Sequence, residues 1–106
     1  MVQVEANLVW LVARDPDDGH WLGVCQAINA TAMGDTWGDF QQCAEESIQL
    51  LFEDLFRSGE LEAFLRRNGW STTSPLPAPG TRVRFDVPFS TERRQRADDV
   101  VAAATA

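Results

Sequence analysis

Residues 34–58, GDTWGDFQQCAEESIQLLFEDLFRS, form the longest stretch of this chain with one regular hydrophobic period. Apolar residues recur there at spacings of three and four, as they do on one face of an α-helix. The members of this face are Trp37, Phe40, Ala44, Ile48, Leu51 and Leu55, with Phe52 and Phe56 beside them. Thr36 suits the N-cap, because its hydroxyl can accept a backbone N–H of the first turn, and Gly59 suits the C-cap. The spacing therefore predicts a helix from about Thr36 to Ser58.

The acidic side chains of this predicted helix fall largely opposite its apolar face. They are Glu45, Glu46, Glu53 and Asp54, and the neutral Gln49 lies on the same side of the helix. The whole chain has 106 residues and a net charge of −7. Because like charges repel, an acidic surface disfavours nucleic-acid phosphates and suits a basic partner.

Upstream of this helix the pattern is typical of strands. Leu8–Ala13 (LVWLVA) is a short apolar run, which predicts a buried strand. The turn-forming residues Asp15–Gly19 (DPDDG) follow it, and His20–Gln26 (HWLGVCQ) alternates like the return strand of a hairpin. A short third strand is predicted at Ala30–Met33.

Downstream, a second helix is predicted at Glu60–Arg67, with acids at its start and arginines at its end. Ser71–Gly80 holds three prolines and predicts an extended connector. Arg82–Phe89 alternates apolar and charged residues, which predicts a half-buried strand. Pro88 cannot donate to a ladder, so this strand is expected to end at a sheet edge. Ser90–Ala106 is predicted to be a short helix or a loose tail.

The predicted order of elements is β-β-β-α-α-β, an α+β fold. We expect an antiparallel half-sheet with one apolar face, covered by the long amphipathic helix, to which the last strand returns. Residues 1–89 are expected to form this domain, and residues 90–106 its short C-terminal helix or tail. A chain of this length supports one hydrophobic core.

No apolar run approaches the roughly 20 residues of a membrane span, and the N-terminal residues do not resemble a signal peptide. A cytoplasmic protein is therefore expected, with no membrane contact. Cys25 and Cys43 show no metal-ligand spacing and are predicted to be reduced, packed as small apolar side chains. A disulfide between them is the alternative, and it requires an oxidising compartment. No cofactor is predicted.

The acidic residues of the turn Asp15–Gly19 raise the question of a calcium site. Counting Asp15 as the first position of an EF-hand loop, the glycine falls at the fifth position and Gln26 at the twelfth, so the pattern fails. A tight hairpin turn is the preferred interpretation, and no metal site is predicted. His20 is the sole histidine and has no nucleophile at a defined spacing, so no catalytic residue is assigned. A metal-dependent hydrolase acting through the Asp15–Asp18 acids stays a minor alternative.

Three arginines close to the C-terminus form a small basic cluster, Arg93, Arg94 and Arg96. Such a cluster can contact phosphates, which makes these residues weak candidates for nucleic-acid binding. Acids flank them on both sides, so a solvated helix turn with pairs such as Arg94–Asp98 is the preferred interpretation.

Four tryptophans are many for this length. Trp10 and Trp37 fall in core-facing patterns. Trp21 and Trp70 are candidate partner-binding anchors, because tryptophan is enriched at interface hot spots. Core packing is the stronger expectation for each of them.

The stretch from Val9 to Asp54 resembles the HicB-type antitoxin domain. The resemblance rests on the hairpin with an aromatic return strand, Gly19–Cys25 (GHWLGVC), on the short strand that runs into Gly34-Asp35-Thr36, and on the acidic amphipathic helix that follows. It implies a β-β-β-α-β half-sheet with a helix on one face, similar to a truncated ribonuclease-H-like fold.

The resemblance also implies a function. HicB-type antitoxins bind HicA, a small basic mRNA-cleaving toxin, and assemble as homodimers or homotetramers. We therefore expect a binding protein rather than an enzyme. Its partner-binding residues would be Trp21, Glu45, Glu46, Glu53, Asp54 and Trp70. The alternative is a solitary HicB-like homo-oligomeric binding or scaffold protein with no toxin partner.

The chain departs from many members of that family at its C-terminus. Only Ser90–Ala106 follows the last predicted strand, which leaves no room for a complete helix-turn-helix or ribbon-helix-helix module. DNA binding is therefore not expected.

Overall fold

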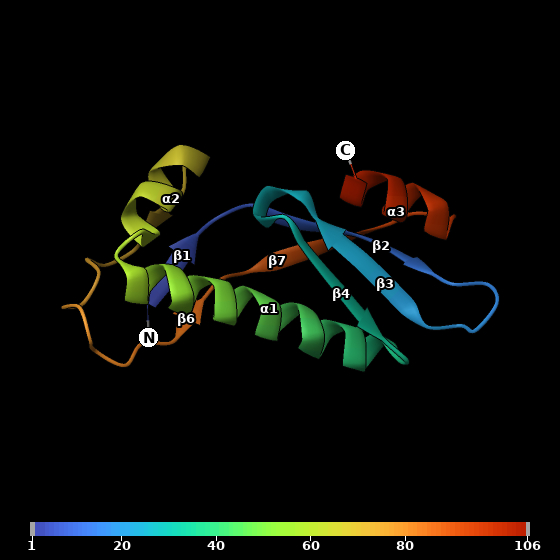
Figure 1. Cartoon of the computed structure of the whole chain (residues 1–106), viewed down its shortest axis with the longest axis horizontal. Coiled ribbons are helices and arrows are strands. Elements are labelled where there is room, and N and C mark those ends of the chain that lie inside the picture. Colours follow the sequence, from blue (N-terminus) through green and yellow to red (C-terminus); the bar gives the residue numbers. More distant parts are fainter. Residues whose placement is uncertain (1, 106) are drawn as a thin grey trace. The chain divides into compact units, whose positions relative to one another are not determined.

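The computed structural model describes residues 2–105 and shows a mixed α+β chain (Figure 1). Its strands are β1 (Val2–Glu5), β2 (Leu8–Arg14), β3 (Trp21–Cys25), β4 (Ala30–Gly34), β5 (Ser71–Thr72), β6 (Phe85–Asp86) and β7 (Phe89–Arg93). Its helices are α1 (Trp37–Ser58), α2 (Leu61–Asn68) and α3 (Ala97–Thr105), with a 3-10 turn η1 (Gln26–Ile28). None of these described helices is both long and apolar enough to cross a membrane.

The chain divides into two compact units that alternate along the sequence. Unit 1 contains the chain up to Asn7 and Ile48–Pro88, whereas unit 2 contains Leu8–Ser47 and the chain from Phe89 onward. Helix α1 therefore contributes its first half to unit 2 and its second half to unit 1. The predicted boundary at residue 89 falls on the first residue of β7, and β7 and α3 both belong to unit 2.

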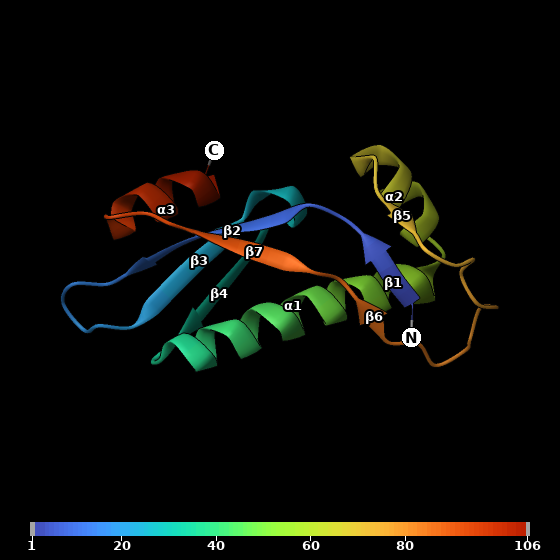
Figure 2. The same ribbon diagram turned by 180° about the vertical axis from the view of Figure 1, so that it is seen from behind.

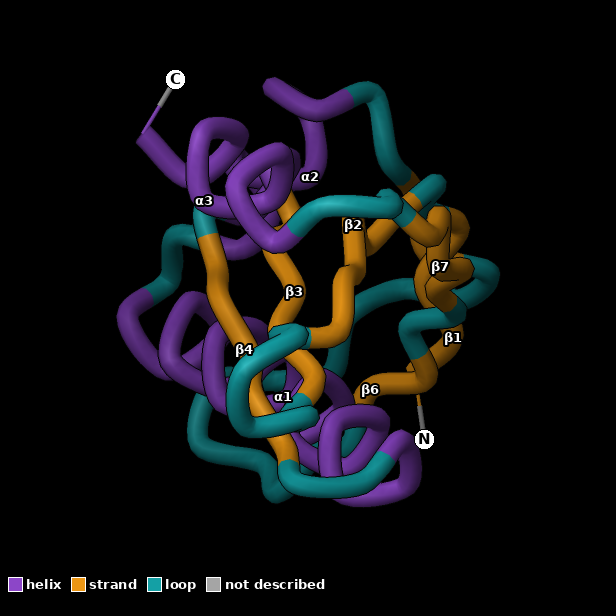
Figure 3. The backbone as a smooth tube through the Cα atoms, turned by 90° about the vertical axis from the view of Figure 1, so that its right-hand side faces the viewer, coloured by secondary structure: helices purple, strands orange, loops and turns teal. Residues whose placement is uncertain are grey.

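Unit 2 is built on a four-stranded sheet with the order β4-β3-β2-β7. Strands β2, β3 and β4 are neighbours in this sheet (Figure 3), and the pairs β2–β3 and β3–β4 are antiparallel, as the predicted hairpin and third strand require. Strand β7 instead runs parallel to β2, with Leu8 opposite Phe89. The expectation of a wholly antiparallel sheet was therefore wrong. A strand that returns after two helices can approach in either direction, since no hairpin constrains it.

Helices cover both faces of this sheet, with the first half of α1 on one side and α3 on the other (Figures 1 and 2). On the α1 side, the fully buried Trp10 packs edge-on against Phe40, with ring centroids 6.0 Å apart. On the α3 side, Ala13, Val24 and Val100 form a second buried cluster. The predicted single apolar face was thus wrong, and burial on both faces explains why β2 is an unbroken apolar run.

Two glycines allow α1 to lie close to the sheet. A Cβ on Gly34 would stand 2.3 Å from the backbone nitrogen of Phe40, and a Cβ on Gly23 would stand 2.6 Å from the Phe40 ring. Neither position has room for a side chain. Glycine at these two sites is what lets the Phe40 ring reach Trp10 at the centre of the unit.

The helix boundaries agree with the sequence prediction. The Asp39 N–H donates to the Thr36 hydroxyl over 3.1 Å, which is the expected N-cap. Helix α1 ends at Ser58, and Gly59 follows it in the left-handed conformation, with φ 78°. The second predicted helix is confirmed as α2.

Unit 1 has a smaller sheet, with the order β5-β1-β6. Strand β1 pairs antiparallel with β5 and parallel with β6. Strand β1 was not predicted from the sequence, because the four-residue alternation VQVE is too short to be distinctive. Aromatic rings fill the core of this unit: Phe52 lies 5.7 Å from Phe85 and 6.1 Å from Phe64 between centroids.

The predicted strand Arg82–Phe89 is split in the structure. Only Phe85–Asp86 forms β6, and Phe89–Arg93 forms β7 in the other unit's sheet. Pro88 lies between them, and it has no N–H to continue a ladder. The predicted alternation of burial is nevertheless confirmed, because Phe85 and Val87 are buried and their neighbours Arg84 and Asp86 are exposed. The prediction of a helix or loose tail from Ser90 onward was wrong for Ser90–Arg93, which belong to β7, whereas Ala97–Thr105 forms the short helix α3.

Candidate functional site

The first eighteen residues of α1 carry acidic side chains and no basic ones. Between Trp37 and Asp54 the acids are Asp39, Glu45, Glu46, Glu53 and Asp54, and the next basic residue is Arg57. The buried face of the helix holds Ala44 and Ile48. The acids predicted opposite the apolar face are therefore at least partly exposed on α1, two of them in its unit 2 half and two in its unit 1 half.

In unit 2 this face presents Glu45 and Glu46, both exposed. Glu46 accepts a hydrogen bond from the side-chain amide of Gln42 over 3.2 Å. Within residues 2–105 neither glutamate forms an ion pair. Their charges are therefore hydrated and available to a partner.

In unit 1 the two remaining acids differ from each other. Glu53 is half-buried, whereas Asp54 is exposed and pairs with Arg57 over 3.1 Å. Because both side chains of that pair are about 70% exposed, the pair contributes little stability and opens easily.

The two tryptophans proposed as anchors lie in different units. In unit 2, Trp21 is half-buried beside Trp37, with centroids 4.9 Å apart, and the Arg93 guanidinium lies 5.1 Å above its ring. In unit 1, Trp70 is half-buried beside Phe64, 5.7 Å between centroids. Both rings therefore have packing partners, and each keeps part of its surface exposed.

The three C-terminal arginines do not form a helix turn. Arg93 ends β7, Arg94 pairs with Glu92 over 3.1 Å, and α3 begins only at Ala97. The predicted helical pair between Arg94 and Asp98 was wrong. The segment is held extended because the Arg94 N–H donates to the Val12 carbonyl, 2.7 Å away, which continues the pairing with β2.

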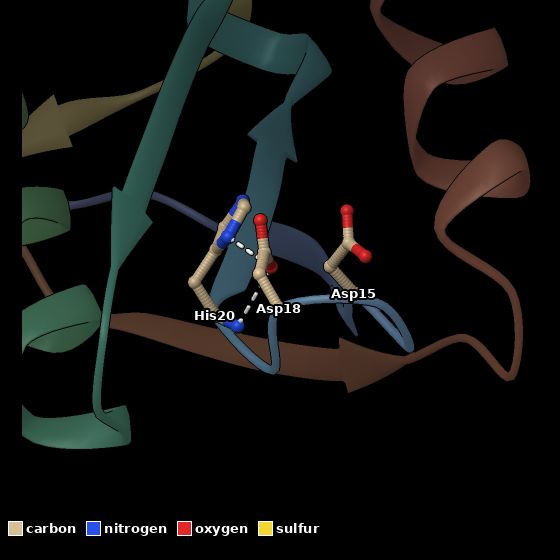
Figure 4. A group of neighbouring side chains, drawn as sticks. All are labelled: Asp15, Asp18 and His20. Carbon is tan, nitrogen blue, oxygen red and sulfur yellow. Dashed lines mark hydrogen bonds and ion pairs between the residues drawn. The ribbon is translucent and has the colours of Figure 1, made fainter.

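The turn between β2 and β3 gathers Asp15, Asp18 and His20 (Figure 4). One ligand atom from each of these side chains lies within 4.8 Å of the others. The sequence prediction considered the acids of this turn without grouping His20 with them. Adjacency within one short turn was the signal that could have found the set.

Hydrogen bonds of the turn itself account for this proximity. The Asp15 carboxylate accepts the Asp17 N–H over 2.8 Å, and the Asp18 carboxylate accepts the His20 N–H over 3.2 Å and contacts its imidazole. Arg14 donates its Nε–H to the Gly19 carbonyl over 2.9 Å, which adds a positive charge to the same turn. That charge opposes a cation, so the geometry fits the predicted hairpin turn best.

Both cysteines are free thiols. Burial raises the pKa of the Cys25 thiol, although hydrogen bonds from the Ile28, Ala27 and Val9 backbones lower it in part. A buried thiol that keeps its proton is a poor nucleophile and a poor metal ligand. Cys25 therefore acts as a small apolar side chain of unit 2.

No family model matches this chain, and neither a curated protein nor a solved structure matches it.

Proposed function

We propose that this chain is an antitoxin-like binding protein that neutralises a small, basic, HicA-type mRNA-cleaving toxin by protein–protein contact. The observation that carries the proposal is the pair of exposed glutamates, Glu45 and Glu46, in the unit 2 part of α1. Neither glutamate forms an ion pair within the described part of the chain. On this proposal the chain performs no chemistry of its own and acts in the cytoplasm, where mRNA is translated.

Charge complementarity supports this choice of partner. A ribonuclease must attract RNA phosphates, so its substrate-binding surface is basic. A helix segment with exposed carboxylates and no basic residue offers the same sign of charge as the RNA backbone and can occupy that surface in its place. Such long-range attraction mainly speeds association, and salt weakens it.

The order of elements in unit 2 also supports the proposal. Strands β2, β3 and β4 precede α1 in the order that the HicB-like half-sheet requires, and the truncated ribonuclease-H-like description rests on the same elements. The acidic face belongs to the helix that packs on that half-sheet.

A sheet edge offers a second contact. Strand β4 lies at one edge of the unit 2 sheet, and its sequence ATAMG has neither a charged residue nor a proline. Met33 on this strand is 58% exposed. Edges that must stay free usually carry charges or proline, so β4 is suited to main-chain pairing with another chain.

The test is rescue of growth. A HicA-type toxin gene from the same genome is expressed with this chain, with Glu45→Lys, or with Asp17→Lys. Asp17 is a matched control because it is exposed in unit 2 and its side chain forms no described interaction. We expect the natural chain and Asp17→Lys to rescue growth, and Glu45→Lys to slow association with the purified toxin about tenfold at low salt. Failure of the natural chain to rescue or bind would contradict the proposal.

The exposed β4 edge favours one other candidate, a solitary homo-oligomer in which this edge pairs with a second copy. Sedimentation of the natural chain and of Met33→Lys separates the two functions. A dimer or tetramer that Met33→Lys dissociates, in a chain that binds no toxin, would establish the oligomeric scaffold instead.

A further inference from the structure

A depression of about 680 Å³ lies in unit 1, and all of its lining residues belong to that unit. The end of α1 lines one side of it with Glu53, Phe56 and Arg57, and the segment from Gly80 to Arg84 lines the other. This volume falls within the range of small-molecule sites, roughly 300–1,000 Å³.

Basic side chains are concentrated around this depression. Arg57, Arg82 and Arg84 line it, which is three of the nine arginines in a chain whose net charge is −7. Glu53 is the one acidic residue of the lining. The local charge is therefore opposite to that of the whole molecule.

These arginines are available to a ligand. Arg82 and Arg84 are exposed, and within residues 2–105 their side chains form neither an ion pair nor a hydrogen bond. Arg57 has only its exposed contact with Asp54. Glu53 forms no ion pair with any of them.

The walls between the arginines are apolar and well supported. Phe56 and Val83 are half-buried, and the Phe56 ring packs against Phe85 with centroids 6.0 Å apart. The Arg84 carbonyl accepts the Val2 N–H over 2.9 Å, which ties the backbone of the lining segment to β1. The Arg84 guanidinium therefore extends from an anchored backbone.

We propose that this depression binds a small organic oxyanion, with its carboxylate or phosphate on Arg82 and Arg84 and its apolar body on Phe56 and Val83. Guanidinium groups bind both kinds of oxyanion through paired, charge-assisted hydrogen bonds, so the two share one recognition chemistry. Glu53, Asp54 and the net charge of −7 oppose a long polyanion, which favours a small ligand. This inference does not depend on the toxin-binding proposal.

The experiment titrates the ¹⁵N-labelled full chain with four probes: benzoate, phenyl phosphate, inorganic phosphate and benzyl alcohol. We expect benzoate and phenyl phosphate to shift the backbone amides of Thr81–Arg84 and Phe56, and benzyl alcohol to shift none. Whichever of benzoate and phenyl phosphate binds with the higher affinity shows whether the natural ligand carries a carboxylate or a phosphate. Inorganic phosphate is expected to bind about tenfold more weakly than phenyl phosphate, because it lacks the apolar body.

Arginine variants test the assignment of residues. Arg82→Gln and Arg84→Gln are each expected to weaken the tighter aromatic probe about tenfold, since each loses a charge-assisted contact. Arg96→Gln, an exposed arginine of unit 2, is the matched control and should leave the affinity unchanged. Unchanged thermal unfolding of each variant shows that the fold is intact. Equal affinity in all three variants, no amide shifts with any anion, or equal binding of benzyl alcohol would overturn the proposal.

Discussion

The two units of this chain build their sheets in opposite ways. In unit 2 the strands have five to seven residues, and β2, β3 and β4 follow one another through short connections. In unit 1, β5 and β6 have two residues each, and both pair with β1 from the start of the chain. Unit 2 is thus organised by its sheet, whereas unit 1 is organised by aromatic packing around Phe52 and Phe85. A sheet of very short strands can be stable where side-chain packing, rather than backbone hydrogen bonding, stabilises the unit.

The sheet edges of the units differ as well. In unit 1 the Gln49 side chain accepts the Phe85 N–H over 3.1 Å and donates to the Phe85 carbonyl, so it occupies the outer side of β6. In unit 2 the outer side of β4 carries no charge or proline, and Met33 is exposed. Of these two edge strands, β4 is therefore the one suited to pairing with a second chain.

The largest effect is expected from Gly34→Ala, which forces α1 away from the unit 2 sheet. The new Cβ would meet backbone atoms of Asp39 and Phe40 at 2.3–2.8 Å, and backbone cannot rotate aside. We expect a loss of about 3 kcal/mol, the upper end of typical overpacking costs. Urea unfolding followed by tryptophan fluorescence measures it.

The control is Gly38→Ala. The nearest atom to its Cβ is the Thr36 hydroxyl at 3.9 Å, so this variant should gain up to about 1 kcal/mol from helix propensity. Equal unfolding midpoints for the two variants would refute the close approach of α1 to β4.

A smaller loss, about 2 kcal/mol, is expected from Gln49→Ala in unit 1, because the Phe85 N–H and carbonyl lose their partner. Hydrogen exchange at the Phe85 amide and urea unfolding measure it. Gln42→Ala is the control, since Gln42 is exposed and bonds only to Glu46. If Phe85 exchanges equally slowly in both variants, Gln49 does not protect β6.

Removal of the α1 cap should be milder. Thr36→Ala loses the hydroxyl that accepts the Asp39 N–H, which is expected to lower stability by about 1 kcal/mol. Thr36→Ser keeps the hydroxyl and should retain most of that stability. Thermal unfolding of the two variants measures the difference, and an Ala variant as stable as the Ser variant would show that the cap contributes nothing.

The smallest expected effect on the free energy of unfolding comes from the Cys25 thiol, and it is absent at neutral pH. Because burial raises its pKa, the folded chain keeps this proton at a pH where the unfolded chain has released it. The unfolding free energy should therefore fall as pH rises above the ordinary thiol pKa of about 8.5. In Cys25→Ala this slope should be shallower. Urea unfolding under reducing conditions across that range measures both slopes, and identical slopes would contradict the assignment.

The elements that could be predicted are those with local causes. Helix α1 follows from its apolar spacing, its Thr36 cap and Gly59, and the β2–β3 hairpin follows from the turn residues Asp15–Gly19. The exposure of Glu45 and Glu46 follows from the same helical period. In each case the residues that determine the structure lie within a few positions of one another, so the pattern is visible in one dimension.

Contacts between segments that are distant in the sequence are visible only in the tertiary structure. The pairing of β1 with β6, the parallel approach of β7 to β2 and the covering of Phe85 by Gln49 join residues far apart in the chain. The arginine-lined depression likewise unites Arg57 with Arg82 and Arg84, which no local period relates. Periodicity states which face of an element is buried, but the partner that buries it depends on the packing of the whole unit.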